Sequence, residues 1–317
     1  MSLKDKFILV TGSSGYVASD LIPSINSEVL GIDYVLSEHT KEKIGIESNK
    51  LKSILQKISP KEIIVVNLAA ARFDFGATPK DYLRLNYECH KKFLHSLDGG
   101  KIKRFIHVSS VAALDGINIT YSDELNCDDA YRSTKYLQEK LINDWCHEHN
   151  VDLTILYPSA IFSNNSRSDT NIGKLQKISQ FIPFVPKIDA IKSLTYLPNF
   201  SKFIIDSITG EIPSGKYLTI EKPSLTVSKI IQFASGRSLR IINIPFLKAI
   251  LRNLANILYV LSLCGKIDLK LTPNRVVKLF SETSYSNINR KDIDLETYRD
   301  RNHLQLTEIL SNFNKNE

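Results

Sequence analysis

Residues 7–18 read FILVTGSSGYVA and contain the features that decide the fold. The run FILV is apolar without interruption, which is typical of a strand buried on both faces of a parallel sheet. Glycines at positions 12 and 15 follow and mark a tight turn. The residues after the turn open a stretch of helical length. The sequence therefore predicts a strand, a tight turn and a helix in direct succession, the first unit of an α/β sheet.

Short apolar runs continue to alternate with stretches of helical length through the first half of the chain. In residues 130–149, for example, Leu137, Leu141, Ile142 and Trp145 mark an apolar face at helical spacing. This alternation predicts an α/β fold, a Rossmann-type doubly wound parallel sheet with helices on both faces. The expected strands are residues 7–12, 28–33, 62–70, 104–110 and 152–159.

The pattern becomes less regular after residue 159. Residues 163–192 are loop-rich with one short helix, whereas residues 193–208 and 216–220 resemble a return to the sheet, and the tail from about residue 241 is mainly helical. We expect a Rossmann domain over residues 1–160, with residues 193–235 returning to it. Residues 161–192 and 236–317 would form a smaller, mostly helical substrate-binding lobe over the carboxyl ends of the strands.

Composition and charge limit the classes of function. The chain has 317 residues, 43% hydrophobic and 24% charged, as in an ordinary globular protein. Its formal charge of +7 is spread along the chain without a nucleic-acid-binding motif. A solvated surface is expected, with a positive cleft for a phosphorylated substrate as the alternative. Four dispersed cysteines and an amino end that runs directly into a strand favour a reducing, cytoplasmic location.

The most apolar stretch is residues 244–265, IPFLKAILRNLANILYVLSLCG. Lys248, Arg252, Asn253 and Asn256 interrupt it, so it is a poor bilayer span and no integral membrane segment is expected. It predicts an amphipathic core or lid helix. Contact with a membrane surface is the alternative.

The turn after the first strand has the features of a dinucleotide site. Gly12 lets the chain turn tightly out of the strand, and Gly15 has no side chain to block a pyrophosphate from the main-chain N–H groups that follow. Ala18 stands where a third glycine is usual. The residues of this turn predicted to bind the cofactor are Gly12, Ser14, Gly15, Tyr16 and Val17.

Asp33 ends the second expected strand, 21 residues after Gly12. A carboxylate there can accept hydrogen bonds from both adenosine ribose hydroxyls, and it would repel a 2′-phosphate. No Arg or Lys directly follows it. The sequence thus favours NAD over NADP, although a solvated aspartate in a turn is the alternative interpretation.

A Tyr-x-x-x-Lys pattern is uninformative by itself, because it occurs at Tyr87/Lys91, Tyr131/Lys135 and Tyr136/Lys140. Position selects among the three. Tyr131 lies 21 residues after Ser110, which ends an expected strand, and it opens the next expected helix. Tyr136 would lie on another face of that helix. Tyr131 and Lys135 are therefore the predicted catalytic pair.

The residue types suit hydride transfer at an alcohol carbon. Such a transfer requires a proton to leave or join the oxygen, but the ordinary pKa of tyrosine, about 10, makes it a poor base at neutral pH. Lys135 and a positive nicotinamide would stabilise the Tyr131 phenolate. Ser110 would hydrogen-bond the reacting oxygen.

The glycine turn, the strand-end aspartate, Ser110 and the Tyr131/Lys135 pair, in this order, resemble the extended short-chain dehydrogenase/reductases, which include nucleotide-sugar epimerases, dehydratases and 4-keto reductases. The resemblance is strong as far as residue 159 and fainter beyond. It implies that Asn86 supports the region of the catalytic lysine, and that further cofactor contacts come from Leu68, Ala69, Ala70, Tyr157 and Pro158. Tyr157 replaces an arginine that is usual in the family.

Departures from the family pattern narrow the expected reaction. Val111 and Ala112 stand where dehydratases have Asp-Glu, so dehydration is not expected. The resemblance implies NAD-dependent redox at a sugar carbon of a nucleotide-linked hexose, and C4 is the expected carbon. The protein would then be an epimerase or a 4-keto-sugar reductase in surface-polysaccharide biosynthesis. A homodimer would be compatible with the family.

Two other functions remain open at this point. One is a dehydrogenase or reductase of a non-sugar alcohol or ketone, with residues 244–263 lining the pocket. The other is a non-catalytic protein that kept the NAD fold. No metal site is predicted. Candidates to hold substrate phosphates are Lys192, Arg237, Arg240 and Arg275.

Overall fold

The computed structural model describes residues 6–58, 62–71, 78–97, 101–122, 124–164, 166–167, 170–263, 273–285 and 290–301, with positions 306 and 309; the side chains of residues 171, 259–263, 274 and 275 lie outside this description. The chain divides into two compact units. Unit 1 comprises Met1–Ser159, Thr195–Thr219 and Arg290–Arg301, and unit 2 comprises Ala160–Leu194, Ile220–Asn289 and Asn302–Glu317.

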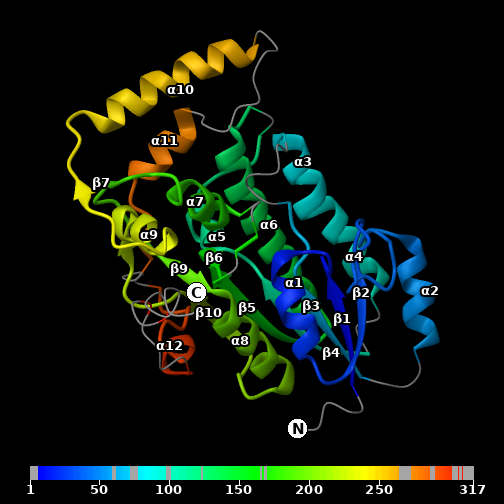
Figure 1. Cartoon of the computed structure of the whole chain (residues 1–317). Helices are drawn as coiled ribbons and strands as arrows, with labels where there is room; N and C mark the ends of the chain where they lie inside the picture. Colours follow the sequence, from blue (N-terminus) through cyan, green and yellow to red (C-terminus); the bar gives the residue numbers. More distant parts are fainter. Residues whose placement is uncertain are drawn as a thin grey trace. The chain divides into compact units, whose positions relative to one another are not determined.

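Unit 1 is built on a six-stranded sheet with the order β10-β5-β4-β3-β1-β2 (Figure 1). Every neighbouring pair in it is parallel. The strands are β1 (Lys6–Thr11), β2 (Glu28–Ile32), β3 (Glu62–Asn67), β4 (Ile102–Val108), β5 (Asp152–Pro158) and β10 (Gly215–Thr219). The parallel sheet is therefore confirmed, and each expected strand ends one to three residues earlier than its sequence pattern suggested.

The order of these strands fixes where a ligand can bind. The chain leaves β1 toward β2 on one side and resumes at β3 on the other, so the strand order reverses between β1 and β3. In open α/β sheets, ligands bind outside the carboxyl ends of the strands at such a reversal. Thr11 ends β1 and Asn67 ends β3, and the two are register partners.

Helices cover both faces of the sheet. Apolar residues of α2, α4 and α6 form one buried cluster with Phe7, Leu9, Val65 and Phe105 of the strands. On the other face, α1 and α8 lie side by side (Figure 1). The helical elements of unit 1 are α1 (Tyr16–Leu21), η1 (Ile22–Ser24), α2 (Asn49–Lys57), α3 (Pro79–Leu83), the π-helical turn η2 (Arg84–Glu88), α4 (Cys89–Ser96), α5 (Val111–Asp115), α6 (Cys127–Glu148), α8 (Leu197–Thr209) and α12 (Thr297–Arg301).

The segment Arg290–Arg301 belongs to unit 1 because it extends the sheet at β10. The N–H of Leu218 donates to the carbonyl of Asp294, and the N–H of Asp294 donates to the carbonyl of Lys216. The Arg301 guanidinium then binds Asp206, near the end of α8, at 2.8 Å. Residues 290–301 thus lie in unit 1 and residues 220–235 in unit 2, which differs from the boundaries expected from sequence.

Unit 2 contains α7 (Asn171–Ser179), α9 (Val227–Ala234), α10 (Leu247–Leu263) and α11 (Pro273–Phe280). A small core of Val185, Ile188, Val227 and Ile231 receives Leu247 from α10 and Leu279 from α11. Short strands complete the element order: β6 (Ala160–Phe162), β7 (Val185–Pro186), β8 (Ile191–Lys192), β9 (Leu194–Tyr196, which ends in unit 1), β11 (Leu225–Thr226) and β12 (Ile241–Ile242). Over the described part of the chain, no helix is long and apolar enough to cross a bilayer.

Candidate active site

Ser110 and Tyr131 come together at the carboxyl end of β4. Ser110 follows that strand and caps α5, since its Oγ accepts from the N–H of Ala112 at 3.2 Å. Tyr131 is the fifth residue of α6, which begins earlier than expected because Asn126 caps it. The two side chains lie close enough for Ser110 to act on the pKa of the Tyr131 hydroxyl. Ser110 and Tyr131, which the sequence links only by a spacing of 21 residues, thus lie close together in the fold.

The Tyr131 ring is held by its neighbours. It makes an edge-on contact with the buried ring of Tyr82, with centroids 5.7 Å apart. Removal from water raises the pKa of Tyr131 above its ordinary value, while the hydrogen bond with Ser110 lowers it by stabilising the phenolate. The resting state is therefore a protonated phenol, and further positive charge is needed to make it a base.

Lys135 lies one helical turn after Tyr131 and is 1% exposed. Its Nζ donates to the carbonyl of Val108 at 3.3 Å and to Oε1 of Gln138 at 2.6 Å. Burial lowers the pKa of Lys135 to about 7, and the negative charge of Glu139 opposes that shift. Near neutral pH a small change in its surroundings therefore changes how much of Lys135 is charged.

Gln138 connects Lys135 to a buried imidazole. Its Nε2 donates to Nε2 of His90 at 2.7 Å, and Nδ1 of His90 donates to the carbonyl of Leu85 at 3.0 Å. Burial and the nearby charge of Lys135 lower the pKa of His90 to about 3, so His90 is neutral. A neutral ring that donates from Nδ1 must accept at Nε2, which directs the Gln138 oxygen toward Lys135.

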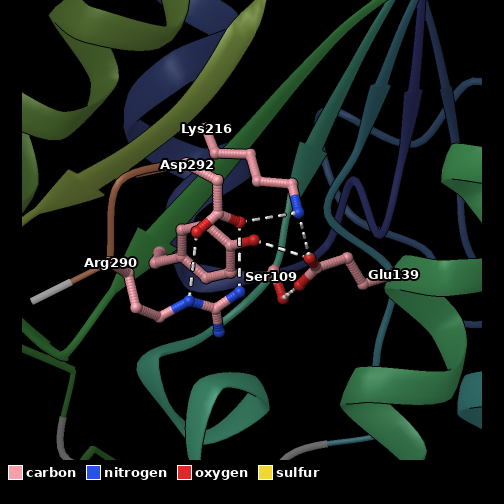
Figure 2. A network of polar contacts seen from close by, with 6 residues as sticks. Ser109, Glu139, Lys216, Arg290 and Asp292 are labelled. Atoms are coloured by element: carbon pink, nitrogen blue, oxygen red, sulfur yellow. Dashed lines mark hydrogen bonds and ion pairs between the residues drawn. The ribbon is translucent and has the colours of Figure 1, made fainter. Parts of the chain in front are cut away.

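Glu139 is the centre of a second polar network (Figure 2). Its carboxylate accepts from the Tyr157 hydroxyl at 2.6 Å and from Ser109 Oγ at 3.4 Å, and it pairs with Lys216 Nζ at 3.5 Å. Lys216 also pairs with Asp292, which binds the guanidinium of Arg290. Charges thus alternate from α6 through β10 to the segment that begins at Arg290.

The sequence did not lead us to these supporting residues. Gln138 and Glu139 lie one turn beyond Lys135 on the same helix, so their helical spacing was a usable signal. Lys216 and Asp292 were not predictable in this way, because only the pairing of distant segments with the sheet brings them to Glu139.

At the glycine turn, the main chain of Gly12 lies very close to the main chain of Leu68 and Ala69. Gly12 has φ +70°, and a Cβ there would lie 2.9 Å from the N of Ala69. Thr11 holds this approach in place, because its Oγ1 donates to Asn67 Oδ1 at 2.6 Å and accepts from the N–H of Ala69 at 3.2 Å. The segment Leu68–Ala70 therefore lies against the turn at the reversal between β1 and β3.

Asp33 is tied to the same turn. Its Oδ2 accepts from the N–H of Ser14 at 3.0 Å and from Ser14 Oγ at 2.8 Å, and its Oδ1 accepts from the N–H of Val35 at 3.2 Å. Gly15 caps α1, and Tyr16 and Val17 form its first residues. The five turn residues and Asp33 thus form one local structure.

Asn86 joins the two halves of the site. It is buried in the π-helical turn η2, accepts from the N–H of Ala71 at 2.7 Å and donates to Thr134 Oγ1 at 3.3 Å. It thus connects the segment after β3 to the residue before Lys135. Such turns are common at functional sites.

Tyr157 and Pro158 end β5 and are buried. The Tyr157 hydroxyl donates to Glu139, and the negative charge there adds to burial in raising the pKa of Tyr157 far above its ordinary value. The contact occupies the polar end of this side chain. A cofactor contact by residues 157 and 158 remains a prediction.

The candidates for substrate phosphates lie in unit 2. Lys192 Nζ donates to the carbonyls of Lys278 and Ser281, and Arg237 donates to the carbonyls of Ser179 and Ile182. Arg275 belongs to α11, and its side chain lies outside the described residues. Their role with substrate remains a prediction.

Comparisons with known proteins agree with this geometry. The sequence model of the NAD dependent epimerase/dehydratase family matches residues 8–184. No curated protein sequence matches the chain.

Solved structures with the same fold were also found. They include UDP-glucuronic acid 4-epimerase from Bacillus cereus in complex with NAD (18% identity, TM-score 0.58, covering 75% of this chain and 87% of that one). UDP-N-acetylglucosamine 4-epimerase from Methanobrevibacter ruminantium is 19% identical (TM-score 0.60, 76% and 86%). dTDP-4-dehydrorhamnose reductase from Bacillus anthracis, in complex with NADP, is 16% identical (TM-score 0.57, 77% and 85%).

Proposed function

Because the chain belongs to the NAD dependent epimerase/dehydratase family, we propose that it moves a hydride between NAD and C4 of a nucleotide-linked hexose, with Ser110, Tyr131 and Lys135 as its catalytic residues. The observation that carries the assignment is that Ser110 follows β4 directly and that buried Lys135, one helical turn after Tyr131, donates to the carbonyl of Val108 at the end of the same strand. All three stand at the carboxyl edge of the sheet, where ligands of such sheets bind.

The residues of unit 1 fit NAD. Gly12 allows the tight turn against residues 68–69, and Gly15, at the start of α1, has no side chain to keep a pyrophosphate from the main-chain N–H groups that follow. The Asp33 carboxylate, held by Ser14, would accept from the adenosine ribose hydroxyls and would repel the 2′-phosphate of NADP. Leu68, Ala69 and Ala70 would line the cofactor where they pass the turn.

Bound NAD would supply the hydride acceptor and a positive ring. Tyr131 Oη would take the proton from the substrate hydroxyl, and Ser110 Oγ would hydrogen-bond the same oxygen and fix its distance. Lys135 would favour the phenolate through its charge. Lowering a tyrosine pKa from its ordinary value of about 10 to near 7 requires roughly 4 kcal/mol of such stabilisation, and burial adds to what Tyr131 requires.

The substrate class is supported by the family and by the fold neighbours, whose titles describe UDP-sugar 4-epimerases and a 4-dehydrorhamnose reductase. Epimerisation and reduction need the same three residues, so either outcome is compatible with the site. Val111 and Ala112, the first residues of α5, provide no acid or base for dehydration. A hexose substrate of this kind is compatible with a role in surface-polysaccharide synthesis.

The catalytic assignment is tested with Tyr131→Phe. We expect turnover to fall below detection while NAD affinity, measured by calorimetry, stays within a few-fold of wild type. Tyr136→Phe is the matched control, because it removes a hydroxyl from the other Tyr-x-x-x-Lys pattern on the same helix and should leave turnover intact. Activity that survives in Tyr131→Phe would refute the assignment.

The reaction type and the substrate class need separate measurements. Denaturing the purified protein and measuring the released nucleotide distinguishes the two outcomes: stoichiometric, tightly held NAD supports an epimerase, and empty protein that consumes NADH supports a reductase. Thermal unfolding with UDP-, dTDP- and GDP-sugars tests the substrate class. If none of them raises the melting temperature, a non-sugar alcohol becomes the better hypothesis.

A further inference from the structure

Helix α10 of unit 2 presents apolar side chains to solvent. Phe246, which directly precedes the helix, is 84% exposed, and Ile250, Leu254 and Ile257 within it are 53%, 46% and 58% exposed. The spacing of four and three residues places Ile250, Leu254 and Ile257 on one face of the helix, and Phe246 stands exposed at its amino end. We call these four residues the α10 apolar face. Exposed apolar surface that is contiguous in this way marks a contact surface.

The neighbouring side of α10 is the one that packs on unit 2. Leu247 joins the small core of the unit, and Ala255 is fully buried. At about 100° per residue, Leu247 and Ala255 lie on the side of the helix next to the exposed apolar residues. The apolar part of α10 is therefore wider than the part that the unit 2 core covers, and the polar residues Lys248, Arg252 and Asn256 occupy the remaining side.

The charge around this helix has a single sign. Residues 223–267 contain no Asp or Glu, although the chain has 34 acidic residues in 317, and they contain Lys229, Arg237, Arg240, Lys248, Arg252 and Lys266. Lys248 and Arg252 are exposed on α10 itself. An apolar face on a helix whose polar side carries only positive charge is the pattern of a helix that lies in an anionic membrane surface.

We propose that the α10 apolar face inserts into the headgroup layer of an anionic phospholipid bilayer and binds the protein peripherally to it. Negatively charged headgroups would attract the stretch 223–267, and the exposed side chains would enter the apolar boundary beneath them. A second copy of the chain is a poorer occupant, because two such stretches would place positive charge against positive charge. This inference is independent of the catalytic assignment, since every residue in it belongs to unit 2.

The test is sedimentation of the full chain with vesicles. Vesicles with about one third phosphatidylglycerol in phosphatidylcholine should bind the protein at least about tenfold more strongly than pure phosphatidylcholine, and added salt should weaken that binding. Phe246→Ser/Ile250→Ser should reduce binding about tenfold or more. Phe181→Ser is the matched control, because Phe181 is an exposed apolar residue of unit 2 outside α10, at 86% exposure.

A second pair of changes keeps the apolar face and so does not depend on how the serine variant folds. Lys248→Gln/Arg252→Gln should weaken binding to anionic vesicles several-fold at low salt and leave binding to phosphatidylcholine unchanged. Turnover in solution should be unaffected in both double variants, which separates this proposal from the catalytic one. Equal binding to both lipids, no binding, or a loss of self-association without a loss of lipid binding in the serine variant would overturn the proposal.

Discussion

Lys135 carries its charge in a place that water does not reach. A buried ammonium is tolerated only where acceptors replace the lost water, and here Val108 and Gln138 provide two of them. Glu139 adds a carboxylate on the same helix and favours the charged form, against the burial that disfavours it. The balance leaves the pKa near neutrality, the range in which a residue can respond to a charged cofactor.

Glu139→Gln should move the pH profile of activity. Losing the carboxylate removes the interaction that raises the pKa of Lys135, so that pKa falls further below about 7. Since the proposed mechanism requires the ammonium, the alkaline limb of kcat/KM should shift to lower pH by about one unit. Asp292→Asn is the control, because it removes a carboxylate from the far end of the same network. An unchanged limb in Glu139→Gln would refute this role.

At the level of single residues, the sequence pointed to the proposed reacting groups but not to the residues that support them. Ser110 and Tyr131 were predictable because each follows a recognisable element boundary at a fixed spacing. The contact between His90 and Gln138 was not predictable, because the sequence carries no sign of which residues of two different helices will meet. Their contact depends on how α4 and α6 pack, which is decided by apolar residues elsewhere on those helices.

Among the elements, α6 carries the largest share of the site. Its 22 residues include Tyr131, Lys135, Gln138 and Glu139. Asn126 starts the helix by accepting from the N–H groups of Asp128 and Asp129 at 2.9 and 3.0 Å. The cap determines where the first turn begins, and hence the position of Tyr131 one turn later.

Asn126→Ala should destabilise the protein by about 1 kcal/mol, because two N–H groups of the first turn lose their acceptor. Asn126→Ser, which preserves an acceptor at the cap, should recover most of that loss. Urea unfolding of the three proteins measures the difference. Equal unfolding midpoints for wild type and the alanine variant would show that the cap contributes nothing.

The elements also show where prediction from sequence ends. The strands of the large sheet were predictable because burial on both faces leaves continuous apolar runs. The two-residue strands of unit 2, such as β8 and β12, were not, since two residues are too few to show any periodicity. The segment Arg290–Arg301 was missed as part of the sheet domain because it contributes main-chain hydrogen bonds rather than an apolar pattern.

For the whole molecule, the buried charge of Lys135 links stability to pH. Its pKa is about 7 in the folded protein against an ordinary value of 10.5, so between these values the unfolded chain holds a proton that the folded chain has lost. Stability from this group therefore rises with pH across that window, by up to about 1.4 kcal/mol per pH unit. Below pH 7 both states are protonated, and the group adds no further slope.

Lys135→Met removes this contribution. The cofactor-free wild type and the variant are unfolded in urea at pH 7, 8 and 9. The free energy of unfolding of the wild type should increase relative to that of the variant as the pH rises. Comparing the two proteins cancels the groups they share. Parallel stability curves would mean that Lys135 titrates alike in the folded and unfolded chains.

Unit 1 is assembled from three separated pieces of chain, and the last of them is Arg290–Arg301. A chain made from its amino end exposes Glu139 and Lys216 long before Asp292 and Arg290 have been translated. Folding of the sheet during synthesis can therefore proceed, but β10 gains its outer main-chain partner only after residues 220–289 of unit 2 have left the ribosome. Residues 290–301 are thus the last part of unit 1 to be translated. Until they pair with β10, the outer edge of that strand lacks these main-chain hydrogen bonds.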